Sequence, residues 1–216
     1  MVGLWTRQGR HAVLLALLLA PTAWAAQGAG RLDGWFAAAL AFAVLHQVWV
    51  WLCWRLELGG RRLSALLGPR AFRVYGAGFV VLVFARMGAA WVVCARTAGT
   101  LAIPPPLVLG ASAVGVPLVV WLFWSIRVHF GFGRALGQDH FDAAVRARPL
   151  VRAGIHRFLP NAMYVVGPLV LWLPALWTRS GPGLLLAAFN HAYLWVHYAC
   201  TEKPDLAAMH GGTPSP

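Results

Sequence analysis

Hydrophobic residues fill most of the chain in six long stretches, and shorter polar segments separate one stretch from the next. Several stretches approach or exceed the roughly 20 residues that a helix needs to cross the hydrocarbon core of a bilayer. None alternates like an outer-membrane barrel strand, and only helices and closed barrels satisfy the backbone in lipid. The pattern predicts an all-α polytopic membrane protein of five or six transmembrane helices, over residues 12–26, 34–54, 72–95, 103–127, 161–178 and 183–200.

The number of helices depends on the first stretch, "RQGRHAVLLALLLAPTAWA". A basic start, an apolar middle and an Ala-Trp-Ala ending are typical of a secretory signal, but the same residues also suit a short retained helix. Residues 1–30 are therefore either a signal-like segment or the first transmembrane helix. Residues 31–212 are predicted to form a single transmembrane domain, followed by a polar tail at 213–216.

The net charge of +12 is distributed unevenly between the two sides of the predicted bundle. Only Arg31, Arg96 and Arg179 fall in the loops of one side. By the positive-inside rule, both termini and the two long basic loops lie in the cytoplasm, and we expect a bacterial inner-membrane protein. Nucleic acid is not an expected partner, because no basic helix or aromatic platform accompanies the charge. The arginines of the basic side are Arg7, Arg10, Arg55, Arg61, Arg62, Arg70, Arg73, Arg127, Arg134, Arg146, Arg148, Arg152 and Arg157.

The composition agrees with a membrane protein, since 60% of the residues are hydrophobic and only 11% are charged. The three cysteines, Cys53, Cys94 and Cys200, show no CxxC or Cys-His spacing. Neither a disulfide framework nor a metal site is therefore expected.

Polar residues in the last hydrophobic stretch follow a helical period. Asn190, Tyr193, His197 and Thr201 recur at i, i+3, i+7 and i+11, and Glu202 continues the stripe to the cytoplasmic rim. In hydrocarbon such a stripe must face a partner helix or a wet cavity. Two interpretations remain open: hydrogen bonding between helices, and a polar pocket that opens toward the cytoplasm.

The preceding span begins with polar residues at the same predicted depth, Asn161 and Tyr164. The loop "TRSGPG" is short, so the last two spans should form an antiparallel hairpin. Just after the fourth span come Gly131 and Gly133, which could let the backbone approach a ligand closely or could simply end a helix.

These three elements, taken in order, resemble the membrane methyltransferases, a group that includes phosphatidylethanolamine N-methyltransferases and isoprenylcysteine carboxyl methyltransferases. The resemblance covers residues 129–212. It rests on the Gly-x-Gly segment, on a loop in which Gly154, His156, Asn161 and Tyr164 match motif positions, and on "EKPDLAAMHGG", which matches at Glu202, Pro204, Leu206 and Gly211.

The chain departs from the family pattern in three places. The motif's Arg-His-Pro is "PNA" at residues 160–162, the following glycine comes one position late at Gly167, and the second glutamate of Glu-Glu-Pro is Lys203. A catalytically inactive protein that keeps the fold is therefore one alternative. An NADPH-dependent enzyme resembling the membrane steroid reductases is another.

The resemblance implies that S-adenosylmethionine is the cosubstrate and that a membrane lipid or another lipophilic molecule is the acceptor. In that view Glu202 and the backbone of 131–133 hold the charged amino-acid portion of the cosubstrate. His156, Asn161, Tyr164 and His197 would bind the rest. His197 or Glu202 would be the catalytic base for an amine acceptor.

Arg86 lies in the middle of a predicted span with no intramembrane carboxylate beside it. Such a charge is a candidate for binding a lipid phosphate, or it could extend to the outer surface beside Arg96. His46 is interpreted as a hydrogen-bonded packing residue.

Overall fold

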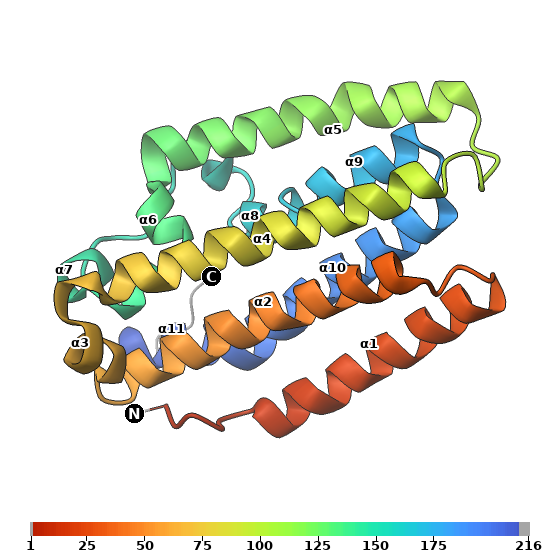
Figure 1. Ribbon diagram of the computed structural model, residues 1–216. Helices are drawn as coiled ribbons and strands as arrows, with labels where there is room; N and C mark the ends of the chain where they lie inside the picture. Colours follow the sequence, from red (N-terminus) through yellow and green to blue (C-terminus); the bar gives the residue numbers. More distant parts are fainter. Residues whose placement is uncertain (1, 212–216) are drawn as a thin grey trace.

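Long helices run side by side between two ends of the molecule in the computed structural model, which describes residues 2–211 (Figure 1). All regular structure within those residues is helical. The long helices are α1 (Gln8–Gly28), α2 (Gly34–Leu58), α4 (Ala71–Arg96) and α5 (Pro105–Ser125). Four segments are long and apolar enough to cross a membrane: Gln8–Gly28, Gly34–Leu58, Arg62–Arg96 and Pro105–Phe130.

Short helices gather at one end of these long helices, on the left in Figure 1. This end carries the basic segments of the sequence and is called the basic end from here on. Its short elements are α3 (Arg62–Leu67), η1 (Gly68–Arg70), η2 (Ile126–Phe130), α6 (Phe132–Ala135), η3 (Gln138–His140), α7 (Ala143–Arg146) and α11 (Lys203–Met209).

The fifth hydrophobic stretch differs from the prediction, because it is not one continuous helix. After η4 (Gly154–Arg157), three residues separate the end of α8 (Ala162–Val165) from the start of α9 (Leu169–Trp177). Pro168 explains the break: it has no N–H to donate and disfavours helical backbone at the residue before it. The apolar segment Ala162–Trp177 is consequently shorter than the four long ones.

The central element of the bundle is α10 (Gly181–His197), which packs against α1, α2, α4 and α9. Its buried residues Leu186, Phe189 and Tyr193 join Phe36 of α2 in the largest apolar core. Most of α5 is exposed, as expected for a helix surrounded by lipid, and it packs mainly on α9 and η4.

The polar stripe of α10 faces inward. All four of its residues are at least 98% buried. Arg86 Nε donates to Asn190 Oδ1, His11 Nε2 lies 3.1 Å from the Tyr193 hydroxyl, and Gln8 donates to the Thr201 hydroxyl at 3.4 Å. Hydrogen bonding between helices thus accounts for three of the four residues, and His197 is the exception.

Arg86 does not extend to the outer surface beside Arg96, so that alternative is wrong. Its guanidinium is buried between helices, bonded to Asn190 and 3.4 Å from His46 Nδ1. Arg86 therefore links α2, α4 and α10 in the middle of the bundle. The polar tail 213–216, by contrast, lies outside the described residues.

Candidate functional site

Glu202 sits where α10 ends in a π-helical turn, η5 (Tyr198–Glu202), at the basic end. Arg55 of α2 holds this turn, because it donates to the carbonyl oxygens of Cys200 and Thr201 at 3.4 Å each. It also donates to the Gly3 carbonyl oxygen at 2.8 Å. Single π-helical turns often occur at functional sites. Here one places a carboxyl group at the rim of the bundle.

Four charged side chains lie near Glu202, three of them buried and Asp139 partly buried. We call them the ionic cluster: Arg55, Asp205, His140 and Asp139. Arg55 Nε lies 2.7 Å from Asp205 Oδ1, with both side chains fully buried. His140 Nε2 lies 3.5 Å from Asp205 Oδ2, and its Nδ1 lies 3.0 Å from Asp139 Oδ1. The cluster joins α2, η3 and α11.

An indole ring supports the ionic cluster from one side. Trp54 stacks on His140 with ring centroids 3.9 Å apart and planes inclined by 18°. Its N–H donates to the Tyr75 hydroxyl at 2.9 Å, and that hydroxyl donates to the Leu136 carbonyl at 2.8 Å. Gly137 follows with φ +85°, and a Cβ atom there would overlap the Trp54 ring. Position 137 therefore requires glycine for two independent reasons.

The electrostatics around Glu202 favour its neutral form. Burial, reinforced by the neighbouring Asp139 and Asp205, raises the pKa of the partly buried Glu202 to about 8, while His140 opposes the shift. For His140, burial disfavours the charged ring, but Asp139 and Asp205 outweigh it, so its pKa is raised. Glu202 consequently holds a proton at neutral pH, while His140 tends toward the imidazolium.

His197, the last residue of α10, has only 2% of its surface exposed. Neither ring nitrogen has a hydrogen-bond partner among residues 2–211. The ring lies 5.9 Å from Trp54 and 6.1 Å from His11, centroid to centroid. Unpaired buried polar atoms are uncommon in proteins and mark places for a water molecule or a ligand group. The ring nitrogens of His197 are thus free to bond a water molecule or a ligand group.

The predicted glycines lie at the start of α6. Gly131 separates η2 from α6 with φ +88°, which favours glycine, and its N–H donates to the Ile126 carbonyl. A Cβ atom at Gly133 would overlap the side chain of Gln138. Both glycines therefore have a local structural role, whatever they bind.

The other predicted residues form two separate groups. His156 is buried against Phe130, 5.1 Å between centroids, and burial lowers the pKa of its ring. Tyr164 contacts Trp195 and Tyr198 at 5.5 Å and 5.0 Å. Asn161 is partly buried just before α8. Within the part of the chain that the structure describes, no hydrogen bond, ion pair or ring contact connects these groups to Glu202.

Comparison with known proteins shows which family the chain resembles. Residues 107–212 match the model of the phospholipid methyltransferases. This region is similar to the phospholipid methyltransferase family. It contains every predicted site residue, and of the ionic cluster it contains all but Arg55.

The family's fungal members show how far the similarity extends. A phosphatidylethanolamine N-methyltransferase of Chaetomium globosum is 34% identical over 108 residues, which cover 48% of this chain and 11% of that protein. Enzymes of the same name from Aspergillus clavatus and Talaromyces marneffei are 33% and 34% identical over 105 and 95 residues, covering 48% and 44% of this chain and 10% and 9% of those proteins. The chain thus matches about a tenth of their length. No solved structure matches it.

Sequence reasoning did not predict the ionic cluster. A usable signal was present: the chain has only six acidic residues, and Asp139, Glu202 and Asp205 fall inside the phospholipid methyltransferase region near its glycines and its C-terminal motif. Asp205 follows Glu202 by three residues, a helical spacing that places both on neighbouring positions. The contribution of Arg55 and Trp54 from α2 could not be inferred, because both lie outside that region.

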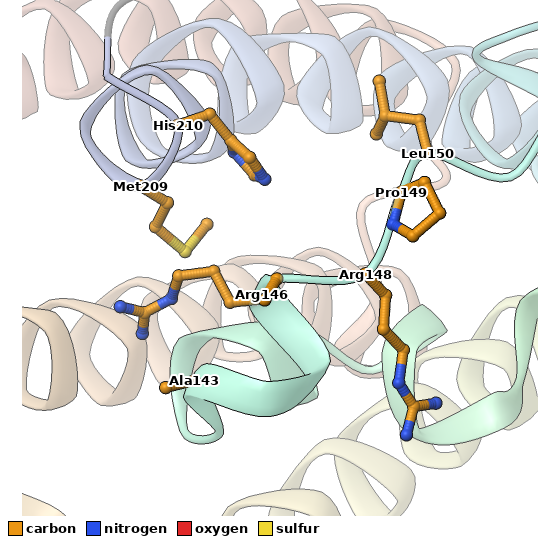
Figure 2. Close-up of a pocket in the computed structure, with 8 residues that line it drawn as sticks. Ala143, Arg146, Arg148, Pro149, Leu150, Met209 and His210 are labelled. Atoms are coloured by element: carbon orange, nitrogen blue, oxygen red, sulfur yellow. The ribbon is translucent and has the colours of Figure 1, made fainter.

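A cavity of about 380 Å³ lies behind the ionic cluster at the basic end. Met209 and His210 face Pro149 and Leu150 across it (Figure 2). Arg146 lines the same cavity and donates to the carbonyl oxygens of Asp139 and His140. None of the predicted site residues lines this cavity, which is therefore separate from the group around Glu202.

Proposed function

We propose that this protein transfers a methyl group from S-adenosylmethionine to the amine of a membrane phospholipid, at the cytoplasmic face. The observation that carries the proposal is the match of residues 107–212 to the phospholipid methyltransferases, a region that contains Glu202 and three further ionisable side chains near it, Asp139, His140 and Asp205. The relatives' names supply the acceptor class, and the positive-inside rule supplies the side of the membrane.

The residues around Glu202 suit a cationic cosubstrate. Bound S-adenosylmethionine would supply an electrophilic methyl group on a positively charged sulfur. Glu202, once ionised, would pair with a positive charge of that molecule. Within the 131–133 segment, the backbone N–H groups of Phe132 and Gly133 would receive its carboxylate, since the N–H of Gly131 already donates to the Ile126 carbonyl. His156, Asn161 and Tyr164 would orient the remainder. Methyl transfer needs little covalent assistance, so positioning supplies most of the acceleration.

An amine acceptor must lose a proton before it can act as a nucleophile. His197 is suited to accept that proton, because both of its ring nitrogens are unpaired and buried. Glu202 is the second candidate when it is a carboxylate. We therefore propose His197 and Glu202 as the catalytic residues.

The same proposal includes the topology. We propose six membrane-spanning segments within one transmembrane domain: α1, α2, α4, α5, the broken helix α8–α9, and α10. The last two would form an antiparallel hairpin around the turn at 178–180, with residues 129–212 as the cofactor-binding part. The bonds from Gln8 and His11 to α10 favour α1 as a retained helix rather than a cleaved signal.

The departure at Lys203 does not remove acidity from the site. Lys203 is exposed, whereas Asp205 two residues later is fully buried in the ionic cluster. Three carboxyl groups, those of Asp139, Glu202 and Asp205, therefore remain around the site, and the change at Lys203 does not by itself argue for an inactive protein.

Binding of S-adenosylmethionine to the detergent-purified protein tests the proposal. Calorimetry should give a Kd on the order of micromolar to tens of micromolar, typical of enzyme substrates. Glu202→Gln should weaken binding at least about tenfold, by removing a charged partner. Asp33→Asn, a matched change at the opposite end, should leave it unchanged. NADPH binding in place of S-adenosylmethionine would favour the reductase alternative and overturn the proposal.

A further inference from the structure

We propose that His140 is a positioning residue of the cosubstrate site. It acts as a buried imidazolium that neutralises the carboxylates around it and leaves Glu202 to receive the positive charge of the ligand. The inference rests on the proposed function, because it concerns the same site. It assigns a role to a residue outside the family motifs described above.

The two carboxylate contacts of the ring favour its charged form. Nδ1 faces an oxygen of Asp139 at 3.0 Å and Nε2 faces an oxygen of Asp205 at 3.5 Å. A neutral imidazole has one N–H and one acceptor nitrogen, so one of the two carboxylates would meet a lone pair. Only the imidazolium presents an N–H to both. The side chain is 98% buried, so water cannot readily replace either contact.

The surroundings stabilise that charge and fix the ring. Trp54 stacks face to face on His140, and the face of an indole attracts cations. Arg146 donates to the carbonyl oxygens of residues 139 and 140, which anchors the backbone of the pair. Trp54 therefore fixes the His140 ring, and Arg146 fixes its main chain.

The charge balance of the ionic cluster explains why the positive charge of His140 affects Glu202. Arg55 and His140 are two cations, and Asp139 and Asp205 are two anions, so the ionic cluster is neutral as a whole. Glu202 is then a third carboxyl group without a cation of its own in the cluster. Glu202 therefore keeps its proton until a positively charged ligand binds. This agrees with its pKa, which burial raises to about 8.

Several other ionisable side chains lie around this pair and belong in the balance. Tyr75 of α4 interacts electrostatically with Glu202, and His197 of α10 with His140. Arg134 of α6 acts on Asp139. Among the described residues, the charged and titratable side chains around Glu202 and His140 are Arg55, Tyr75, Arg134, Asp139, Arg146, His197 and Asp205.

The variant His140→Gln removes the positive charge and keeps a polar side chain. The cluster then has one excess negative charge, so Glu202 should ionise at a higher pH. The pH midpoint of S-adenosylmethionine binding should rise by about one unit, the usual effect of losing a nearby opposite charge. A residue with only a structural role would weaken binding at every pH and leave the midpoint where it is.

The experiment measures the Kd for S-adenosylmethionine by calorimetry from pH 6 to 9.5. It compares the wild type, His140→Gln, Glu202→Gln, the double variant, and His129→Gln as an exposed control. The midpoint should rise only in His140→Gln and vanish in both Glu202→Gln variants. An unshifted midpoint in His140→Gln overturns the inference, whereas a wild type that does not bind at any pH overturns the proposed function instead.

A second measurement decides the question if His140→Gln does not fold. Nitrogen-15 spectra of histidine-labelled wild type should show an imidazolium that persists at pH 7.5, above the ordinary pKa of histidine. If every histidine ring is neutral at that pH, the inference is wrong.

Discussion

Each acidic residue at the basic end has a different environment, although three of them lie close together. Asp205 is fully buried against Arg55, Asp139 pairs with His140, and Glu202 lies partly exposed at the rim. Ion pairs hold the first two in the cluster. Glu202 is left to change its charge, which is the property that a cation-binding carboxylate needs.

A pH dependence follows for the wild type. Burial raises the pKa of Glu202 to about 8, so its proton must leave before it can pair with a cation. The affinity for S-adenosylmethionine should therefore rise about tenfold per pH unit below that pKa and level off above it. Calorimetry in detergent would measure this. An affinity that stays constant or falls between pH 6.5 and 8.5 would contradict the assignment of Glu202.

Among the helices, α10 determines where the site residues lie. It carries the polar stripe, the unpaired His197 and the turn with Glu202, and it packs on α1, α2, α4 and α9. Besides apolar packing, α1 makes two buried polar contacts with this segment, from His11 to Tyr193 of α10 and from Gln8 to Thr201 of η5. Losing α1 would leave those groups without partners in an apolar medium, which is costly.

The retained helix α1 makes a simple prediction. The intact mass of the purified protein should include residues 1–28, because α1 supplies partners for the stripe of α10. Mass spectrometry of protein purified from membranes would show this directly. A mature chain that begins close to Ala26 would identify the segment as a cleaved signal.

The contact between α2 and the segment after α6 depends on Gly137. In Gly137→Ala the new methyl group would overlap Trp54 and would force alanine into positive φ. Overpacking and backbone strain together should cost about 2 kcal/mol of stability, seen as a lower Tm. Gly30→Ala has a positive φ but open space around it, so it should lower the Tm less. Equal effects would mean that the Trp54 contact is unimportant.

Sequence patterns predicted the elements better than the contacts between them. Hydrophobic stretches matched α1, α2, α4 and α5, because membrane spans are encoded locally. Pro168 in the sequence could have indicated the break between α8 and α9, but the continuous apolar run around it predicted one helix. The ionic cluster escaped prediction for a different reason. It combines side chains from α2, η3 and α11, and no local spacing indicates that these meet.

Over the whole molecule, charge and chemistry are concentrated at the same end. The short helices α3, α6, α7 and α11 lie at this basic end (Figure 1). The ionic cluster lies there too, because Asp139 and His140 come from between α6 and α7 and Asp205 comes from α11. A soluble cosubstrate made in the cytoplasm can reach this end if the positive-inside rule holds. A lipid acceptor can approach from the bilayer beside the same helices.

Accessibility labelling tests this orientation. The three native cysteines are buried, so a single new cysteine can be read out. Arg152→Cys should react with an impermeant maleimide only from the cytoplasmic side, and Arg31→Cys only from the opposite side, since both positions are exposed. The reverse pattern would place the site outside and would contradict the proposed supply of cosubstrate.

Methyl transfer itself tests the central claim most directly. The purified protein is incubated at pH 8 with S-adenosylmethionine labelled in the methyl group and with vesicles that contain phosphatidylethanolamine, and the lipid extract is counted. We predict label in the phospholipid headgroup, reduced at least about tenfold in Glu202→Gln and unchanged in Asp33→Asn. If folded protein that binds S-adenosylmethionine leaves the lipid unlabelled, phospholipid N-methylation is not its activity.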